Sequence, residues 1–288
     1  MAAGGYDGCL ISVDLRSIID ERREWEILID AHVLGIEWLI WILSLARSVR
    51  RLFCLSQRFL TTRLILMLVV NMVVPIVMHV LSRFTGHKER WGEFVDVKIN
   101  AAVLLQNEIR KKKVGRVWIS GVCDPYQPLE KKYKITRRCL EILSRHGWPV
   151  TVQTKSVLVL RDLELLRGIK DVEVGFSIPT SDDSIRGMFE PKASSIGERI
   201  DALEKLHLEG IRTFAMVAPM LPNVEALPSQ LAGKVDYVLV DKMNYHNADW
   251  IYQKHGLGYA STEGFFNQRK NEIAGAFEKE KIQCRLLF

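Results

Sequence analysis

Short apolar runs alternate with amphipathic segments along the chain from about residue 95 onward. Six runs read as buried strands, because they are rich in β-branched residues and bounded by Gly, Pro or Asp: residues 95–100, 116–122, 149–155, 172–178, 211–219 and 236–241. The segments between them have helical spacing, as in residues 101–113, where Val103, Leu104 and Ile109 form the predicted stripe. This alternation predicts parallel βαβ units, and a series of them favours an open or partial barrel over a sandwich.

The clearest of these helices is predicted for residues 195–210. Ser195 and Glu198 have the spacing of a capping box, and Gly210 lies where a glycine often ends a helix. The apolar positions between them form one stripe at helical spacing, made of Ile196, Ile200, Leu203 and Leu206. Both ends and the buried face of this helix are therefore predicted from the sequence.

The stretch LILMLVVNMVVPIVMHVL, residues 64–81, has no formal charge over eighteen residues. That length reaches the lower limit for a membrane-spanning helix, and residues 34–45 would supply a second span, with arginines between them in a cytoplasmic turn. Against this, Asn71, Pro75 and His79 interrupt the stretch, and Glu37 interrupts the other run. The hydropathy pattern alone leaves a membrane hairpin and an unusual loop both open.

The composition of the 288 residues is that of a globular protein, with 48% hydrophobic residues and a net charge of +6 at pH 7. A charge of this size permits anionic partners without requiring them. Five scattered cysteines, with no CxxC pair and no secretory signal, argue against a disulfide framework and predict a reducing, cytoplasmic location. All eighteen lysines lie from Lys88 onward, and we expect three parts: an unassigned segment 1–63, the apolar stretch 64–81, and a barrel over residues 82–288.

In such barrels the chemistry resides in the loops that follow the strands, so the residues at the strand ends are the candidates for a site. Six polar or charged residues stand there: Asp124, Lys155, Ser177, Glu190, Arg199 and Asn244. Taken singly, each also reads as a turn residue, a helix cap or a surface ion pair. None of them identifies a chemistry by itself.

The order of the sequence blocks around these residues is specific. Seven blocks follow one another: RFTGHKERWGEFVDVKINA, DPYQPLE with ITRRCLEIL, TVQTKSVLVLRDLELL, FSIPTSDD, FEPKASSIGERIDALEKL, MVAPMLP and VDKMNY. Block after block, they resemble the radical S-adenosylmethionine (SAM) superfamily in its spore photoproduct lyase-like branch, over about residues 82–244. The resemblance implies an α/β fold in the form of a partial (β/α)6 TIM-like barrel. It also implies SAM and a 4Fe–4S cluster as cofactors, and an electron donor of the flavodoxin or ferredoxin type as a partner.

The resemblance implies eight SAM-binding residues: Asp124, Tyr126, Gln127, Lys155, Ser177, Glu190, Arg199 and Asn244. It places Asp124 and Gln127 near the methionine amino group, because a carboxylate at a strand end accepts hydrogen bonds from an ammonium. Lys155 and Ser177 are placed near the carboxylate or the ribose of SAM. Arg199 is expected to pair with the carboxylate of SAM, and Asn244 is placed on the adenosine side.

One element of the family is missing from this chain. In the family a CxxxCxxC motif, whose thiolates bind three irons of the cluster, precedes RFTGH, and here the uncharged stretch 64–81 stands in its place. We interpret this stretch as the family's loop read in a shifted frame. Codons permitted for residues 65–80 encode PYAGCQHGCSYCYAR one base out of step, with cysteines spaced as the motif requires.

Two codon junctions in this stretch leave no choice of base. Met72 followed by Val73 encodes only Gly in the shifted frame, and Met78 followed by His79 encodes only Ala. Both agree with the HGC and CYA of the family. We therefore favour a compensated frameshift over a membrane hairpin.

The sequence thus predicts a radical SAM enzyme-like protein that is inactive as written, because the cluster cysteines are absent. The family chemistry is the reductive cleavage of SAM to a 5′-deoxyadenosyl radical, and lyase or repair chemistry on nucleic acid is the candidate reaction. Lysines 111–113, 131 and 132 make nucleic acid a candidate partner, whereas a membrane is not expected as one. The alternatives are a non-enzymatic degenerate barrel and a membrane-associated protein with a hydrophobic N-terminal hairpin.

Overall fold

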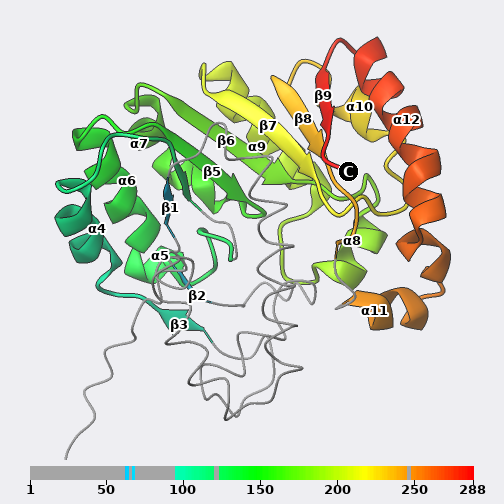
Figure 1. Cartoon of the computed structure of the whole chain (residues 1–288), viewed down its shortest axis with the longest axis horizontal. Coiled ribbons are helices and arrows are strands. Elements are labelled where there is room, and N and C mark those ends of the chain that lie inside the picture. The colour runs from blue at the N-terminus through cyan, green and yellow to red at the C-terminus, as the bar shows by residue number, and fades with distance from the viewer. Residues whose placement is uncertain (1–61, 65–66, 69–94, 120–122, 245–247) are drawn as a thin grey trace, which may run out of the picture. The chain divides into compact units, whose positions relative to one another are not determined.

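The computed structural model describes residues 62–64, 67–68, 95–119, 123–244 and 248–288 (Figure 1). These residues belong to a compact unit, Leu60–Phe288, that is separate from Met1–Phe59. Apart from residues 62–63, the predicted segment 1–63 lies outside the described residues. The same is true of the alternative membrane hairpin and of most of the stretch 64–81. Within the described ranges, every helix is too short or too polar to serve as a membrane span.

Seven strands in the described part of the chain form one parallel sheet. Their order across the sheet is Thr62–Leu64 (β1), Val117–Ile119 (β4), Val150–Thr154 (β5), Val172–Ser177 (β6), Arg212–Val217 (β7), Tyr237–Val240 (β8) and Gln283–Leu286 (β9). Every neighbouring pair is parallel. The strands follow one another in chain order and the two edge strands do not pair, so the sheet is an open barrel, as predicted.

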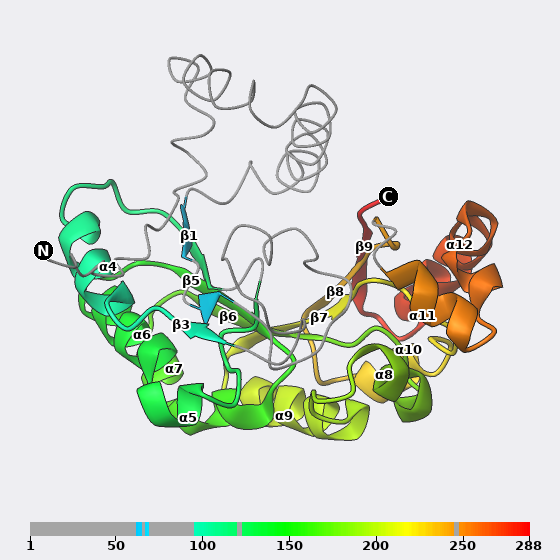
Figure 2. The ribbon, with the colours of Figure 1, turned by 90° about the horizontal axis from the view of Figure 1, so that it is seen from below.

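Helices connect the strands and cover one face of the curved sheet (Figure 2). In chain order they are Ala101–Ile109 (α4), Glu130–Tyr133 (α5), Ile135–Arg145 (α6), the 3-10 helix Val157–Asp162 (η2), Leu163–Arg167 (α7), Asp183–Phe189 (α8), Ile196–Leu208 (α9), Leu227–Leu231 (α10), Asp249–Lys254 (α11), the 3-10 helix Gly258–Ser261 (η4) and Glu263–Lys279 (α12). The main core lies between the sheet and these helices. A smaller apolar cluster joins α8, α11 and η4.

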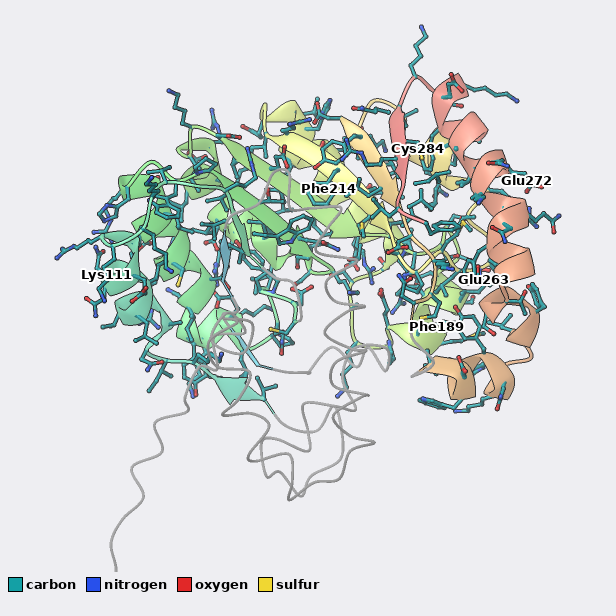
Figure 3. All side chains as sticks on the ribbon, viewed as in Figure 1. Lys111, Phe189, Phe214, Glu263, Glu272 and Cys284 are labelled. Carbon is teal, nitrogen blue, oxygen red and sulfur yellow. The ribbon has the colours of Figure 1, made fainter. Side chains whose placement is uncertain are left out.

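Alternation along the strands gives the sheet two unlike faces. Toward the helices it presents fully buried apolar residues such as Val152 and Val174. On the other face, the ring of Phe214 lies across Gly175, where an added Cβ would come within 2.3 Å of ring atoms. Phe214, labelled in Figure 3, lies on the sheet. Its ring also stacks on Tyr237, with centroids 5.2 Å apart, and meets Trp118 edge-on at 6.3 Å. Aromatic side chains from β4, β7 and β8 thus line the inner face.

The prediction of a sheet strand at residues 95–100 is wrong. Only Asp96–Val97 (β3) is a strand there, and it pairs antiparallel with Met67–Leu68 (β2) in a separate two-stranded sheet. Ile99 is 66% exposed, so the apolar pattern of this run does not reflect burial in the main sheet. The first strand of the barrel is β1 instead, and β9 adds a seventh strand that the sequence did not predict.

The two helices described from the sequence have different outcomes. In α9 the capping box of Ser195 and Glu198 is present, the predicted stripe is buried, and Gly210 has a φ of +75°. In α4 the predicted stripe is confirmed at Ile109 and wrong at the other two positions, because Val103 is 63% exposed and Leu104 is 45% exposed. The face of α4 that is buried consists of Ala101, Leu105 and Ile109, spaced four residues apart.

Candidate active site

The carboxylate of Asp124 holds the loop after β4 against the end of β5 through hydrogen bonds. Its Oδ1 accepts hydrogen bonds from the backbone N of Tyr126 at 2.8 Å and from the Thr154 hydroxyl at 2.7 Å. Its Oδ2 accepts one from the backbone N of Lys155 at 2.6 Å. Burial raises the pKa of this carboxyl, although the charge of Lys155 and the hydrogen bonds act in the opposite direction. Asp124 therefore lies at the strand ends with both oxygens engaged.

Four of the predicted residues come together where β5 and β6 end. Arg199, on α9, is fully buried, and its Nη1 donates to the carbonyl oxygen of Ser177 at 2.7 Å. Arg199 Nη2 lies 2.7 Å from Glu190 Oε2. Lys155 Nζ lies 3.8 Å from the other oxygen of the same carboxylate. Lys155, Ser177, Glu190 and Arg199 are called the Lys155 cluster below.

Arg199 and Glu190 form a buried ion pair at the centre of the Lys155 cluster. Arg199 Nη2 and Glu190 Oε2 are both shielded from solvent and lie 2.7 Å apart, so each charge compensates the other. An α-amino acid carries the same two kinds of charge, since its carboxylate pairs with a guanidinium or an ammonium and its own ammonium pairs with a carboxylate. The residue types of the cluster therefore suit the methionine end of SAM.

Tyr126 contacts a second group of charged residues, around Asp162. Its side chain is fully buried and its hydroxyl donates to Asp162 Oδ2 at 3.1 Å. Asp162 in turn accepts from Arg137 at 2.7 Å and from Arg161 at 2.7 Å. Burial and the charge of Asp162 raise the pKa of Tyr126 well above its usual range. The adjacent Gln127 is also buried, so the DPYQ block is anchored to the fold at its centre.

Asn244 belongs to a different strand end. Its Nδ2 donates to Asp241 Oδ2 at 3.0 Å and to the carbonyl of Lys242 at 3.1 Å. Burial raises the pKa of Asp241. This group follows β8, two strands along the sheet from β6. The structure thus places Asn244 on the same edge of the sheet as the Lys155 cluster and leaves its predicted role as a prediction.

Sequence reasoning did not select three residues at this edge. Gln153 donates from Nε2 to the Ser177 hydroxyl at 3.0 Å, and Thr154 holds Asp124. Lys98, after β3, lies near Cys123; burial lowers the pKa of its ammonium while the thiol charge acts to raise it. A polar residue inside the apolar run VTVQT is a signal that would have found Gln153.

The described cysteines do not form a set of cluster ligands. Cys123 follows β4, Cys139 lies in α6, and Cys284 lies in β9. Burial raises the pKa of Cys139 to about 12 and that of Cys284 to about 11. Within the described ranges, no three His, Cys, Asp or Glu side chains are grouped so that they would hold a metal ion. An iron–sulfur cluster needs several thiolates close together, so these residues do not fit one.

Known proteins resemble the central part of the chain. The family model described as the radical SAM superfamily matches residues 84–226. An uncharacterized protein of Methanocaldococcus jannaschii is 36% identical over 135 residues, which are 47% of this chain and 51% of that protein. The radical SAM Nalpha-GlyT isomerase of Pseudomonas phage M6 is 24% identical over 147 residues, 51% of this chain and 30% of that protein. The chain thus spans about half or less of the length of these relatives.

A solved structure of a spore photoproduct lyase mutant with bound AdoMet and dinucleoside spore photoproduct has the same fold. The TM-score is 0.55 at 13% sequence identity, over 78% of this chain and 76% of that chain. The open parallel sheet of this chain therefore has the partial-barrel fold of that enzyme. The family match over residues 84–226 and this shared fold show a radical SAM superfamily domain in the chain.

Proposed function

We propose that this chain is a SAM-binding member of the superfamily and that the Lys155 cluster holds the amino-acid end of SAM. The observation that carries the proposal is the buried ion pair of Arg199 Nη2 and Glu190 Oε2, 2.7 Å apart, with Lys155 on the other oxygen of the same carboxylate. Both atoms lie at the carboxyl ends of β5 and β6, the edge where parallel α/β sheets bind ligands. Lys155 stands beside them with a further positive charge.

Each residue of the cluster has a separate task in this proposal. Arg199 and Lys155 attract the carboxylate of the ligand, while Glu190 accepts from its ammonium. Ser177 fixes the guanidinium of Arg199 through its carbonyl oxygen and receives a hydrogen bond from Gln153 on its hydroxyl. Asp124 ties the neighbouring loop to β5 and keeps Lys155 in position. The cluster therefore orients the ligand before any chemistry begins.

In the superfamily, one-electron reduction of bound SAM through the iron–sulfur cluster supplies the radical chemistry. The described residues do not fit that cluster, so we propose that the chain as written binds SAM without cleaving it. The frameshift interpretation of residues 64–81 belongs to this proposal. Nucleic acid stays the candidate substrate class for a chain with an intact loop, because the fold is shared with a lyase bound to a dinucleoside photoproduct.

A calorimetric titration of the full chain with SAM tests the proposed site. We expect Lys155→Met to weaken SAM at least about tenfold, the equivalent of about 1.4 kcal/mol, because it removes a charge next to the ligand carboxylate. Free methionine should compete with SAM for the unchanged chain. In contrast, 5′-methylthioadenosine lacks the amino-acid end, so it should bind to Lys155→Met and to the unchanged chain with equal affinity. The control is Lys170→Met, a change at an exposed lysine elsewhere. Equal SAM affinity in both variants would exclude this site.

A further inference from the structure

Four neighbouring strands of the sheet carry one continuous row of side chains on its inner face. Ser177 on β6 is in register with Met216 on β7, Met216 with Leu239 on β8, and Leu239 with Arg285 on β9. Ser177 follows Gly175 by two residues, so it shares the inner face with that glycine. This row, called the β6–β9 row below, therefore begins in the Lys155 cluster and ends at Arg285.

The middle of the β6–β9 row is apolar and only partly covered. The inner face of a closed barrel is filled by packed side chains, yet Met216 and Leu239 are half-buried and neither packs against the main core. The residues that follow them, Val217 and Val240, are fully buried on the helix side. Met216 and Leu239 thus offer a ligand an apolar surface across two adjacent strands.

Arg285 adds a positive charge at the end of the row. Its neighbours in β9, Cys284 and Leu286, pack against the main core, and Cys284 is labelled in Figure 3. Alternation along the strand therefore turns Arg285 to the inner face. The side chain is exposed, and its guanidinium makes no hydrogen bond or ion pair with the residues that the structure describes.

Two acids near this row have other partners. Glu173, on the inner face of β6, accepts from Arg212 at 2.6 Å. Asp241, which follows β8, accepts from Asn244 Nδ2 at 3.0 Å. An inward-pointing charge can protect an edge strand from pairing with another chain, but that role gives no reason for the uncovered apolar residues beside Arg285. An anionic ligand accounts for both features.

The row indicates the chemistry of that ligand. A guanidinium binds a carboxylate through two parallel hydrogen bonds, and its single charge matches a carboxylate better than the nearly two charges of a phosphate monoester. Neighbouring strands are about 5 Å apart, so a molecule that reaches from Arg285 across Leu239 to Met216 spans about 10 Å. We propose that the β6–β9 row binds a small carboxylic acid with an apolar body. This acid is a second ligand beside SAM, and in that respect the inference rests on the proposed function.

A calorimetric titration of the full chain with octanoate tests the row, because octanoate joins a carboxylate to an apolar chain of suitable length. We expect Arg285→Gln to weaken octanoate about fivefold or more by removing the charge, and Arg285→Lys to weaken it less. Leu239→Asn should also weaken it, because it removes apolar contact area. Octylammonium, which has the same body and the opposite charge, should bind the unchanged chain more weakly than octanoate.

Matched controls make the same changes elsewhere. Arg110→Gln replaces an exposed arginine after α4, and Leu208→Asn replaces a leucine that is 79% exposed on α9. Neither control should change the affinity for octanoate. The inference is wrong if octanoate does not bind, if test and control variants behave alike, or if octylammonium binds equally well. Tighter binding of octyl phosphate, lost in Arg285→Gln, would overturn the assignment to a carboxylate.

Titrations with SAM separate this inference from the proposed SAM site. Arg285→Gln should bind SAM like the unchanged chain, and Lys155→Met should bind octanoate like the unchanged chain. SAM binding without octanoate binding would refute the second site alone, whereas octanoate binding without SAM binding would refute the SAM site alone. Competition between SAM and octanoate for the unchanged chain would place both in one site and overturn the second one.

Discussion

Asp124 links the charge state of one carboxyl to the stability of the fold. Burial raises its pKa in the folded state above the 3.8 of an exposed aspartate, so folding favours the protonated form. Its contribution to the free energy of unfolding is therefore fully present below pH 3.8 and is lost as the pH rises through the folded-state pKa. We expect the stability difference between the unchanged chain and Asp124→Asn to fall as the pH rises from about 4.

The slope of that difference should not exceed about 1.4 kcal/mol per pH unit, the value for one proton. Urea unfolding of both proteins at several pH values between 4 and 8 measures it. Asp241 also has a raised pKa, but it is present in both proteins and cancels. A difference that is constant or grows with pH would contradict the burial argument.

Gly175 is the residue for which the inner face of the sheet leaves no room. A Cβ there would lie 2.3 Å from ring atoms of Phe214, and that ring is fully buried and stacked on Tyr237. We expect Gly175→Ala to lower the free energy of unfolding by about 1–3 kcal/mol through overpacking, as measured by urea unfolding.

Two further variants make this prediction specific. Adding Phe214→Leu to Gly175→Ala should recover part of the loss, because the smaller side chain leaves space for the methyl group. Gly275→Ala, in the middle of α12 with no atom within 4 Å of the new Cβ, should instead stabilise the chain by up to about 1 kcal/mol. A harmless Gly175→Ala would show that the ring moves aside freely.

At the level of elements, one buried carboxylate starts helix α6. Glu130 is fully buried; its Oε2 accepts from the backbone N of Ile135 at 2.9 Å and of Thr136 at 3.1 Å, and its Oε1 accepts from Arg161. Glu130→Gln replaces one acceptor oxygen by a donor and leaves Arg161 without its full charge partner. We expect a loss of about 2–4 kcal/mol in the free energy of unfolding.

The control for Glu130→Gln is the same substitution at a glutamate on the surface of α6. Glu141 pairs with Arg137 at 3.2 Å, and both side chains are about two-fifths exposed. Glu141→Gln should therefore change stability by less than about 0.5 kcal/mol. Denaturation followed by circular dichroism measures both variants, and equal effects would mean that burial does not set the strength of these bonds.

The local sequence pattern predicted an element correctly where its apolar residues are also its buried residues. α9 carries its cap, its stripe and its terminal glycine in one segment, so its ends and its buried face were predicted. α4 was predicted as a helix with Val103 and Leu104 on the wrong face, because both are apolar yet exposed. The short strands β1 and β9 gain their places only by pairing with β4 and β8, and such pairing is not visible in a local pattern.

The candidate site shows the same division. The rule that chemistry follows the strands selected Lys155 and Ser177, the family resemblance gave Arg199 its role, and the fold brings the three together. Neither the rule nor the resemblance could tell which group a side chain in a loop contacts, and the hydroxyl of Tyr126 donates to Asp162. Direction within a loop depends on tertiary contacts, so it had to come from the structure.

At the level of the whole molecule, β1 lies directly before the residues to which the frameshift interpretation applies. β1 ends at Leu64 and pairs in parallel with β4, which makes it the first strand of the barrel. The shifted frame is inferred to begin just after Leu64, at the start of the loop where the family holds its cluster. The strand would then be read in the correct frame, and the loop that follows it in the wrong one.

The frameshift interpretation leads to a prediction for a chain in which the segment after β1 is rewritten in the shifted frame, called the recoded chain below. If residues 65–80 are replaced by PYAGCQHGCSYCYAR, three cysteines spaced CxxxCxxC follow β1, and their thiolates supply the donors that the described residues lack. Anaerobic reconstitution with iron and sulfide should then give a brown protein with about four irons per chain, whereas the chain as written should stay colourless. With SAM and dithionite, 5′-deoxyadenosine should form with the recoded chain alone. A recoded chain in which the three cysteines are serines is the control, and an active, brown preparation of the chain as written would refute the frameshift interpretation.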